Sequence, residues 1–188
     1  MDIYIKQWND LILYCSFDNT YKMAWSKALV ELTVNTNESI KDIVKLDFHD
    51  IARLCLKYYW NQTIFFDLIQ SSNMKKPPEI ISSTRSLITL YFNKKQSEQP
   101  IRFEKIDFYS IGLALEFELT VKNIVRTLKQ DVCWRFKNLN RETYEIYDLD
   151  RNKGKVFLNK NDVIMLKEHS DFFIYNNKLS LDTDVRGL

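Results

Sequence analysis

The sequence predicts a mainly α-helical protein of about five to six helices, with a small antiparallel β-hairpin or sheet in its C-terminal third, an α+β fold. Apolar residues recur at three- and four-residue spacing in several long windows up to about residue 129. Beyond that point aromatic and β-branched residues alternate in part, and the turn sequence from Asp150 to Gly154 separates two short runs. The 188 residues include only three glycines and three prolines, which argues against an all-β sandwich with its many tight turns.

Four windows in the first half of the chain have helical periodicity. They predict helices over residues 1–14, 21–32, 48–69 and 79–92. The sequence Asp18-Asn19-Thr20 is predicted to stop the first helix and cap the second, and Ser39 or Asp47 to cap the third. Because the third window is apolar over much of its circumference, we expect it to be the central helix.

Two polar breaks interrupt this helical part. Lys75-Lys76-Pro77-Pro78 is predicted to form a rigid link, because residues before proline avoid the α region. The stretch from Asn93 to Pro100 is the best candidate for an internal linker. The sequence therefore predicts a helical domain over residues 1–95 and a second part over residues 101–180, packed on the first as one unit. The polar tail, residues 181–188, is predicted to be flexible.

The second part is predicted to begin with a helix from Ser110 to Lys129. Aromatic and β-branched residues then predict strands over Val132–Phe136 and Thr143–Tyr147. After the turn at Asp150–Gly154, Val156–Leu158 is the predicted return strand. Asn159 or Asn161 is predicted to cap a last helix that runs through Val163–Leu166.

The sequence lacks the motifs of several enzyme classes. Phosphate-binding loops of the P-loop and Rossmann types need clustered glycines, and none of the three glycines lies near another. Asp148-Leu149-Asp150-Arg151-Asn152 is similar to the start of an EF-hand loop. However, Gly154 falls at the seventh loop position and Asn159 at the twelfth, so the comparison fails.

Metal-ligating and nucleophilic side chains are also few and scattered. The only histidines, His49 and His169, have no close Cys or His neighbours of the kind that a zinc site needs. Cys15, Cys55 and Cys133 are far apart and form no CxxC pair, so we expect unreactive thiols in a reducing compartment. We predict no catalytic residue, no metal ligand and no cofactor in this chain. Without a signal peptide or a bilayer-length apolar window, we expect a cytoplasmic protein that does not span a membrane.

The basic residues carry the main functional signal, although the net charge of only +2 neither demands nor excludes nucleic acid. Between residues 121 and 160 ten Lys and Arg residues stand against five Asp and Glu, interleaved with Trp134, Phe136, Tyr144 and Tyr147. This mixture suits a surface that follows a phosphate backbone and stacks on bases, but it also suits a solvated hairpin with aromatic residues in its core. The predicted nucleic-acid contacts are Arg53, Lys57, Lys75, Lys76, Arg126, Arg135, Lys137, Arg141, Arg151 and Lys153.

Three stretches together resemble a known family. The first runs from Asn19 to Leu32, the second consists of Phe48–Ala52 followed by Lys57–Gln62 with its Tyr58-Tyr59-Trp60 run, and the third runs from Gln70 to Pro78. They are similar to the N-terminal, pre-catalytic region of bacterial HNH endonuclease-like proteins, which are often found near mobile or defence genes. The resemblance covers about Asn19 to Leu166 and implies a DNA-handling module, with the metal-dependent HNH module on its C-terminal side.

The catalytic part of that family has no counterpart here. After Leu166 the chain offers only His169, Asn176 and Asn177, whereas an HNH site needs a His-rich strand and further Asn and His residues. No catalytic residue is therefore carried over, and a divalent metal is expected only if an HNH module is present.

Three functional hypotheses remain open. The first is a non-catalytic DNA-binding or regulatory module. The second is a protein-interaction module, an inhibitor or adaptor of a phage or mobile element, favoured by the 14% aromatic content. The third is an HNH-type nuclease whose catalytic module is missing from this chain or whose metal site forms in an unrecognised way. For that third case the candidate metal-site residues are Asp148, Asp150, Glu168 and His169.

Overall fold

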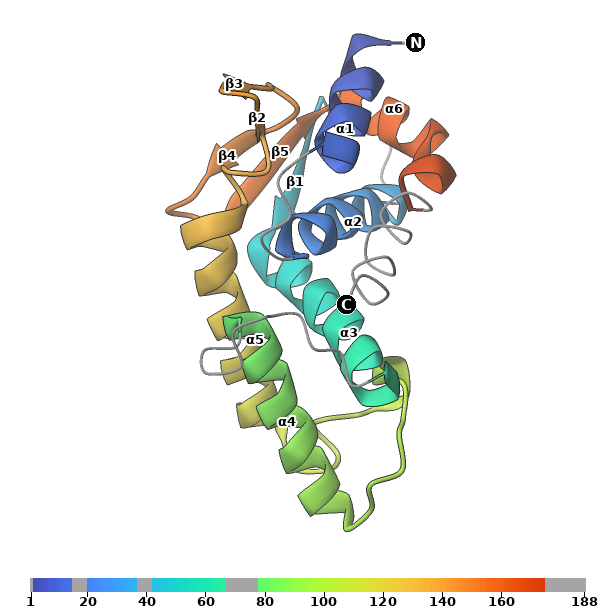
Figure 1. Cartoon of the computed structure of the whole chain (residues 1–188), viewed down its shortest axis with the longest axis vertical. Coiled ribbons are helices and arrows are strands. Elements are labelled where there is room, and N and C mark those ends of the chain that lie inside the picture. Colours follow the sequence, from blue (N-terminus) through green and yellow to red (C-terminus); the bar gives the residue numbers. More distant parts are fainter. Residues whose placement is uncertain (1, 15–19, 37–41, 67–77, 175–188) are drawn as a thin grey trace.

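The computed structural model of the chain describes residues 2–14, 20–36, 42–66 and 78–174. The fold class predicted from the sequence is confirmed. The α-helices are α1 Ile3–Tyr14, α2 Tyr21–Val34, α3 Phe48–Phe66, α4 Glu79–Lys95, α5 Ala114–Thr127 and α6 Lys160–Glu168. A small antiparallel sheet lies at one end, with α1, α2 and α6 on one side of it and α3, α4 and α5 extending away from it (Figure 1). Of the predicted link Lys75-Lys76-Pro77-Pro78, only Pro78 is among the described residues. Cys15, the predicted cap residues Asp18, Asn19 and Ser39, and the tail over residues 181–188 lie outside them.

Helix α3 lies at the centre, as its broad apolar surface predicts, and packs against α2, α4 and α5. Trp60 is fully buried on α3. Its ring lies 5.6 Å from that of Tyr91 on α4 and 5.6 Å from that of Phe108, which precedes α5. The Trp60 indole Nε1 also donates to the Ile101 carbonyl at 3.0 Å. The segment after the polar stretch Asn93–Pro100 is therefore packed directly onto the central helix.

The main sheet has the strand order β1-β5-β4, with β1 Ile43–Asp47, β4 Asp148–Asp150 and β5 Lys155–Asn159. Strand β1 was not predicted from the sequence. Its burial alternates, with Val44 and Leu46 turned inward, and Val44 is paired with Leu158 of β5. At the end of β1 the His49 backbone N–H donates to Asp47 Oδ1 at 2.9 Å, so the prediction that Asp47 caps α3 is confirmed.

The prediction of a strand at Val132–Phe136 was wrong, because this stretch continues the path of α5. A π-helical turn, Leu128–Val132, follows α5, and the Cys133 N–H donates to the Leu128 carbonyl at 3.0 Å. The Phe136 N–H then donates to the Val132 carbonyl at 2.9 Å. Val132 and Phe136 are buried and Trp134 is exposed, which is a helical spacing and not a strand alternation.

The predicted strand at Thr143–Tyr147 is also largely wrong. Only Thr143 lies in a strand, β3 Glu142–Thr143, which pairs with β2 Asn138–Leu139. The predicted turn and return strand before α6 are confirmed, and Asn159 Oδ1 accepts from the Asp162 N–H at 2.9 Å as the predicted cap. Thr20 precedes α2, but its hydroxyl makes no capping bond and lies 2.8 Å from the hydroxyl of Tyr59.

Aromatic residues connect the two ends of the chain in one core. Trp8 of α1 is fully buried, and its ring lies 5.6 Å from Phe136 and 5.9 Å from Phe173. Trp25 of α2 donates through Nε1 to the Tyr147 hydroxyl at 3.1 Å. These contacts hold the π-helical turn and the following segment against α1 and α2. Within the part of the chain that the structure describes, no helix has the length and apolar character needed to cross a bilayer.

Candidate functional site

Cationic side chains line a surface groove where the end of α5 meets the turn between β4 and β5. In Figure 1 α5 runs alongside α4 and up to this turn. The groove has a volume of about 530 Å³. The residues that line it are Lys122, Asn123, Val125, Arg126, Lys129, Gln130 and Arg151. Four of these carry a positive charge and none is acidic.

Helix α5 supplies two of these cations through the spacing of its sequence. Lys122 and Arg126 are four residues apart, so they lie on one face, while Val121, Ile124 and Leu128 are buried on the other. Lys122 and Arg126 are both exposed. The Arg126 guanidinium lies 3.6 Å from the Glu79 carboxylate, and both side chains are more than half exposed. An ion pair this exposed contributes only about 0–1 kcal/mol, so it leaves Arg126 available to another anion.

The π-helical turn brings the other two cations together. Because the Cys133 N–H donates to Leu128, the Lys129 carbonyl lacks its ordinary α-helical partner. Arg151 Nε donates to that carbonyl at 3.1 Å, and Lys129 Nζ donates to the Asn152 carbonyl at 3.2 Å. Neutral carbonyl groups fix these side chains but do not cancel their charge. Both cations are thus held in place and keep unused donors for an anion.

Gly154 allows Lys129 to pass close over the turn. Its φ is +66°, a left-handed conformation that glycine adopts without steric cost. A Cβ at this position would lie 3.0 Å from Lys129 Cε and 3.2 Å from Nζ. The Gly154 carbonyl also accepts from the Phe48 N–H at 2.9 Å, which ties the turn to the start of α3. The backbone therefore favours glycine here, and a Cβ would force the end of the Lys129 side chain to move by a few tenths of an ångström.

The predicted nucleic-acid contacts are distributed unevenly around this groove. Arg126 and Arg151 line it. Lys153 is in the same turn and lies 3.5 Å from Asp150, while Arg135 follows the π-helical turn and lies 3.3 Å from Asp131. Sequence reasoning did not select two lining residues, Lys122 and Lys129. Their signal was the i, i+4, i+7 spacing of Lys122, Arg126 and Lys129 along one helical face.

Four other predicted contacts lie elsewhere. Lys57 of α3 donates to Glu31 at 2.5 Å, and Lys137 is 9% exposed and donates to Glu145 at 2.7 Å. The Arg53 guanidinium lies 5.2 Å from the ring centroid of Phe117. Arg141 is exposed in the turn between β2 and β3, at a φ of +69°. Lys75 and Lys76 lie outside the described residues.

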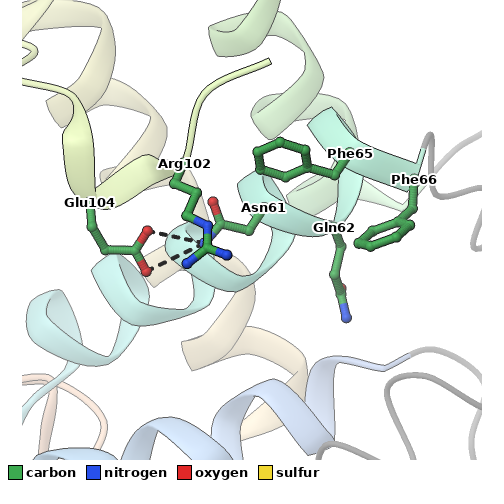
Figure 2. A pocket seen from close by; sticks show the side chains of 6 residues that line it. All are labelled: Asn61, Gln62, Phe65, Phe66, Arg102 and Glu104. Carbon is green, nitrogen blue, oxygen red and sulfur yellow. Dashed lines mark hydrogen bonds between the residues drawn. The ribbon is translucent and has the colours of Figure 1, made fainter.

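A second hollow lies at the C-terminal end of α3 (Figure 2), with a volume of about 480 Å³. Figure 2 shows Phe65 and Phe66 at one end and Arg102 and Glu104 at the other. The Asn61 amide lies between them and donates to Glu104 Oε2 at 3.2 Å. Phe66 is 73% exposed, which is unusual for a phenylalanine. This hollow combines an exposed aromatic end with a hydrogen-bonded polar end.

A third polar cluster joins α3 to α5 at the surface. Glu118 accepts from the Tyr109 hydroxyl at 2.8 Å, and its other carboxylate oxygen lies 3.1 Å from His49 Nε2. The hydrogen bond from Tyr109, followed by that from His49, holds the pKa of Glu118 below its ordinary value. His49 and Glu118 are 44% and 40% exposed, so the cluster faces solvent. Its geometry serves to connect two helices.

The residues considered for a metal site are distributed over two elements. Asp148 and Asp150 lie on β4, where Asp150 accepts from the Lys153 N–H at 2.9 Å; Glu168 and His169 lie at the end of α6. Over residues 2–14, 20–36, 42–66 and 78–174, no three His, Cys, Asp or Glu side chains gather in a way that could hold a metal ion. Cys55 and Cys133 are free and buried, and burial raises the pKa of both thiols.

Comparison with known proteins gave no match: no family model, no curated protein and no solved structure shows significant similarity to this chain.

Proposed function

We propose that this chain is a non-catalytic nucleic-acid-binding module that holds a phosphate backbone in the groove between α5 and the β4–β5 turn. The observation that carries the proposal is the lining itself, in which Lys122, Arg126, Lys129 and Arg151 converge without an acidic neighbour in the lining. Clustered Lys and Arg side chains bind the phosphate backbone of a nucleic acid, because each contact with a phosphate releases a condensed counterion.

The cations have complementary tasks in this proposal. Arg151 and Lys129 are fixed by backbone carbonyl groups, so little side-chain entropy is lost when they meet a phosphate. Arg126 exchanges the exposed Glu79 carboxylate for a phosphate oxygen, and its planar guanidinium suits two parallel hydrogen bonds. Lys122 extends the positive line by one helical turn along α5.

The resemblance to the pre-catalytic region of HNH endonuclease-like proteins stays a prediction. It agrees with a binding role and points to DNA as the natural ligand. The groove supports the proposal in a different way, through charge alone, so the proposal does not depend on the resemblance.

A salt titration tests the proposal. We expect fluorescence anisotropy to show binding of labelled oligonucleotides at low salt, with log Kd changing linearly against log salt concentration. Four phosphate contacts predict a slope of about 3 to 4 in magnitude. Lys122→Gln combined with Arg126→Gln should weaken binding roughly tenfold or more and lower the slope by about 2.

The matched control removes the same charge elsewhere. Lys6 on α1 and Lys160 on α6 are exposed and outside the groove lining, so Lys6→Gln with Lys160→Gln brings the net charge equally from +2 to about 0. Binding should change little in this control. If the two double variants weaken binding equally, net charge and not the groove determines the affinity. If the wild type does not bind at low salt, the proposal is refuted.

The alternative of a protein-interaction module is favoured by one observation, the exposed Phe65 and Phe66 beside the hollow in Figure 2. Exposed aromatic side chains are typical anchors of protein interfaces. Under this alternative a tagged wild-type chain retains a host protein that the Phe65→Ser, Phe66→Ser variant does not retain. Identical retention by both chains would exclude this face as the interface.

A further inference from the structure

We infer that the groove takes single-stranded nucleic acid, with one unpaired base stacked on Trp134. This inference rests on the proposed function and adds the strand state of the ligand to it. Trp134 lies two residues after the π-helical turn that carries Lys129, and the residue is 39% exposed. A rigid aromatic ring next to a line of cations is the arrangement that sequence-independent single-strand binding uses.

The indole of Trp134 is fixed in place beside the groove. Its Nε1 donates to the Gln130 carbonyl at 2.9 Å, and Gln130 is one of the lining residues. The Arg135 guanidinium lies 5.1 Å from the indole centroid and 3.3 Å from Asp131, so a further cation stands against the ring. Because the ring N–H is already bonded and the Arg135 guanidinium lies over the ring, a base would stack on the remaining exposed apolar part of the indole.

The other aromatic residues of this region belong to the core. Phe136 is fully buried and packs against Trp8 with its ring tilted, and the Tyr147 hydroxyl donates to the Cys133 carbonyl at 2.7 Å inside the protein. Tyr144 is half-buried. Of the four aromatic residues that the sequence placed among the basic ones, Trp134 is the one that the structure turns outward. The stacking role therefore falls to a single residue.

The strand state follows from what an exposed indole can contact. In a duplex both faces of a base are covered by its neighbours, so a ring at the protein surface meets only phosphate and sugar. An unpaired base exposes a π-face, and stacking it on an aromatic side chain strengthens binding by roughly tenfold or more. The four cations act on either form of the ligand, whereas Trp134 gains only with a single strand.

Tryptophan fluorescence provides a direct readout at this site. Of the four tryptophans in the chain, Trp8, Trp25 and Trp60 are fully buried, so solvent-accessible emission comes from Trp134. We expect oligothymidine to quench this emission and to bind at least roughly tenfold more tightly than a DNA duplex of the same length. Oligouridine is titrated in parallel. Because both oligomers carry unpaired bases, a difference between their affinities shows whether the groove prefers DNA or RNA.

Two variants separate the stacking from the charge. Trp134→Leu should remove the preference for single strands and leave duplex affinity unchanged, because the cations remain. Phe66→Leu alters an exposed aromatic residue outside the groove and should change neither affinity. Thermal unfolding of each variant confirms that the fold persists.

The outcomes are distinguishable from those of the proposed function. Equal affinity of the wild type for single strand and duplex, or a preference that survives Trp134→Leu, overturns the inference while the groove proposal stands. Single-strand binding without any change in Trp134 emission also overturns the inference. The exposed indole would then be assigned to a contact with a protein. Absence of all binding at low salt overturns the proposed function and this inference together.

Discussion

Single residues join segments that are far apart in the sequence, and Tyr147 is the clearest example. Its hydroxyl accepts from Trp25 Nε1 at 3.1 Å and donates to the Cys133 carbonyl at 2.7 Å. This one oxygen therefore connects α2 to the segment that follows the π-helical turn. The side chain is buried, so water cannot replace either bond.

Tyr147→Phe should lower the free energy of unfolding by about 1–3 kcal/mol, because it leaves a buried indole N–H and a carbonyl without this partner. Chemical denaturation measures the change. Tyr144→Phe removes a hydroxyl from a half-buried neighbour and serves as the control. Equal stability losses in the two variants would mean that the buried bonds contribute nothing specific.

The two glycines with positive φ form a matched pair for a second prediction. Gly154→Ala and Gly112→Ala both place a Cβ on a left-handed residue, which costs roughly 1–2 kcal/mol. Only at Gly154 does the Cβ meet a groove cation, Lys129, at 3.0 Å; at Gly112 the nearest atom is Lys94 Nζ at 3.5 Å. Gly154→Ala should therefore weaken oligonucleotide binding as well as stability, and Gly112→Ala stability alone. Anisotropy and thermal unfolding on both variants test this difference.

At the scale of elements, α6 carries a pH dependence in its first turn. Burial, followed by the charges of Asp148 and Asp2, raises the pKa of Asp162 from 3.8 to about 6. The folded state then binds more protons than the unfolded state between these values. The stabilisation that Asp162 contributes is fully present below its pKa in the unfolded chain, 3.8, and it is lost as the pH rises towards its folded-state pKa of about 6.

Asp162→Asn should remove this dependence while keeping an oxygen that can accept a hydrogen bond in the helix cap. The melting temperature of the variant relative to wild type should rise with pH between 3.8 and about 6 and then level off. Asp171→Asn, at an exposed site beyond the C-terminal end of α6, controls for the change of net charge. A difference that is constant or falls with pH would contradict the assignment.

The helices were the most predictable elements, because their apolar residues repeat over three or more turns. Strand β1 was missed since five residues with two inward positions, Val44 and Leu46, give too short an alternation. At Val132–Phe136 the β-favouring residue types misled, although the buried positions 128, 132 and 136 follow a helical period.

The candidate site was predictable only in part for a related reason. Arg126 and Arg151 were chosen for their basic side chains, but basic character alone does not distinguish them from Lys57 and Lys137. Those two lysines are held by Glu31 and Glu145, acidic partners that only the packed structure brings into contact. Lys129 meets the β4–β5 turn through the π-helical turn, a backbone feature without a sequence signature here.

At the scale of the whole molecule, the described elements on both sides of the Asn93–Pro100 stretch share one hydrophobic core. Strand β1 pairs with β5, α2 packs on α6, and α3 packs on α5. Each of these contacts joins a residue of the first 95 to one of the last part of the chain. The two predicted parts should therefore unfold together and not in sequence.

Calorimetry of the full chain should show one transition whose calorimetric and van't Hoff enthalpies agree. Phe108→Leu gives the sharper test, because Phe108 lies in the second part yet its ring stands 5.6 Å from Trp60 and 4.8 Å from Phe117. The substitution should lower the single midpoint, with a loss of roughly 1–3 kcal/mol, and leave the transition undivided. Two transitions, of which only one shifts, would show that the parts fold independently. The residues that line the groove all lie in the second part. If the parts fold independently, the groove should form without α1 to α4. If they share one core, the geometry of the groove depends on the whole chain.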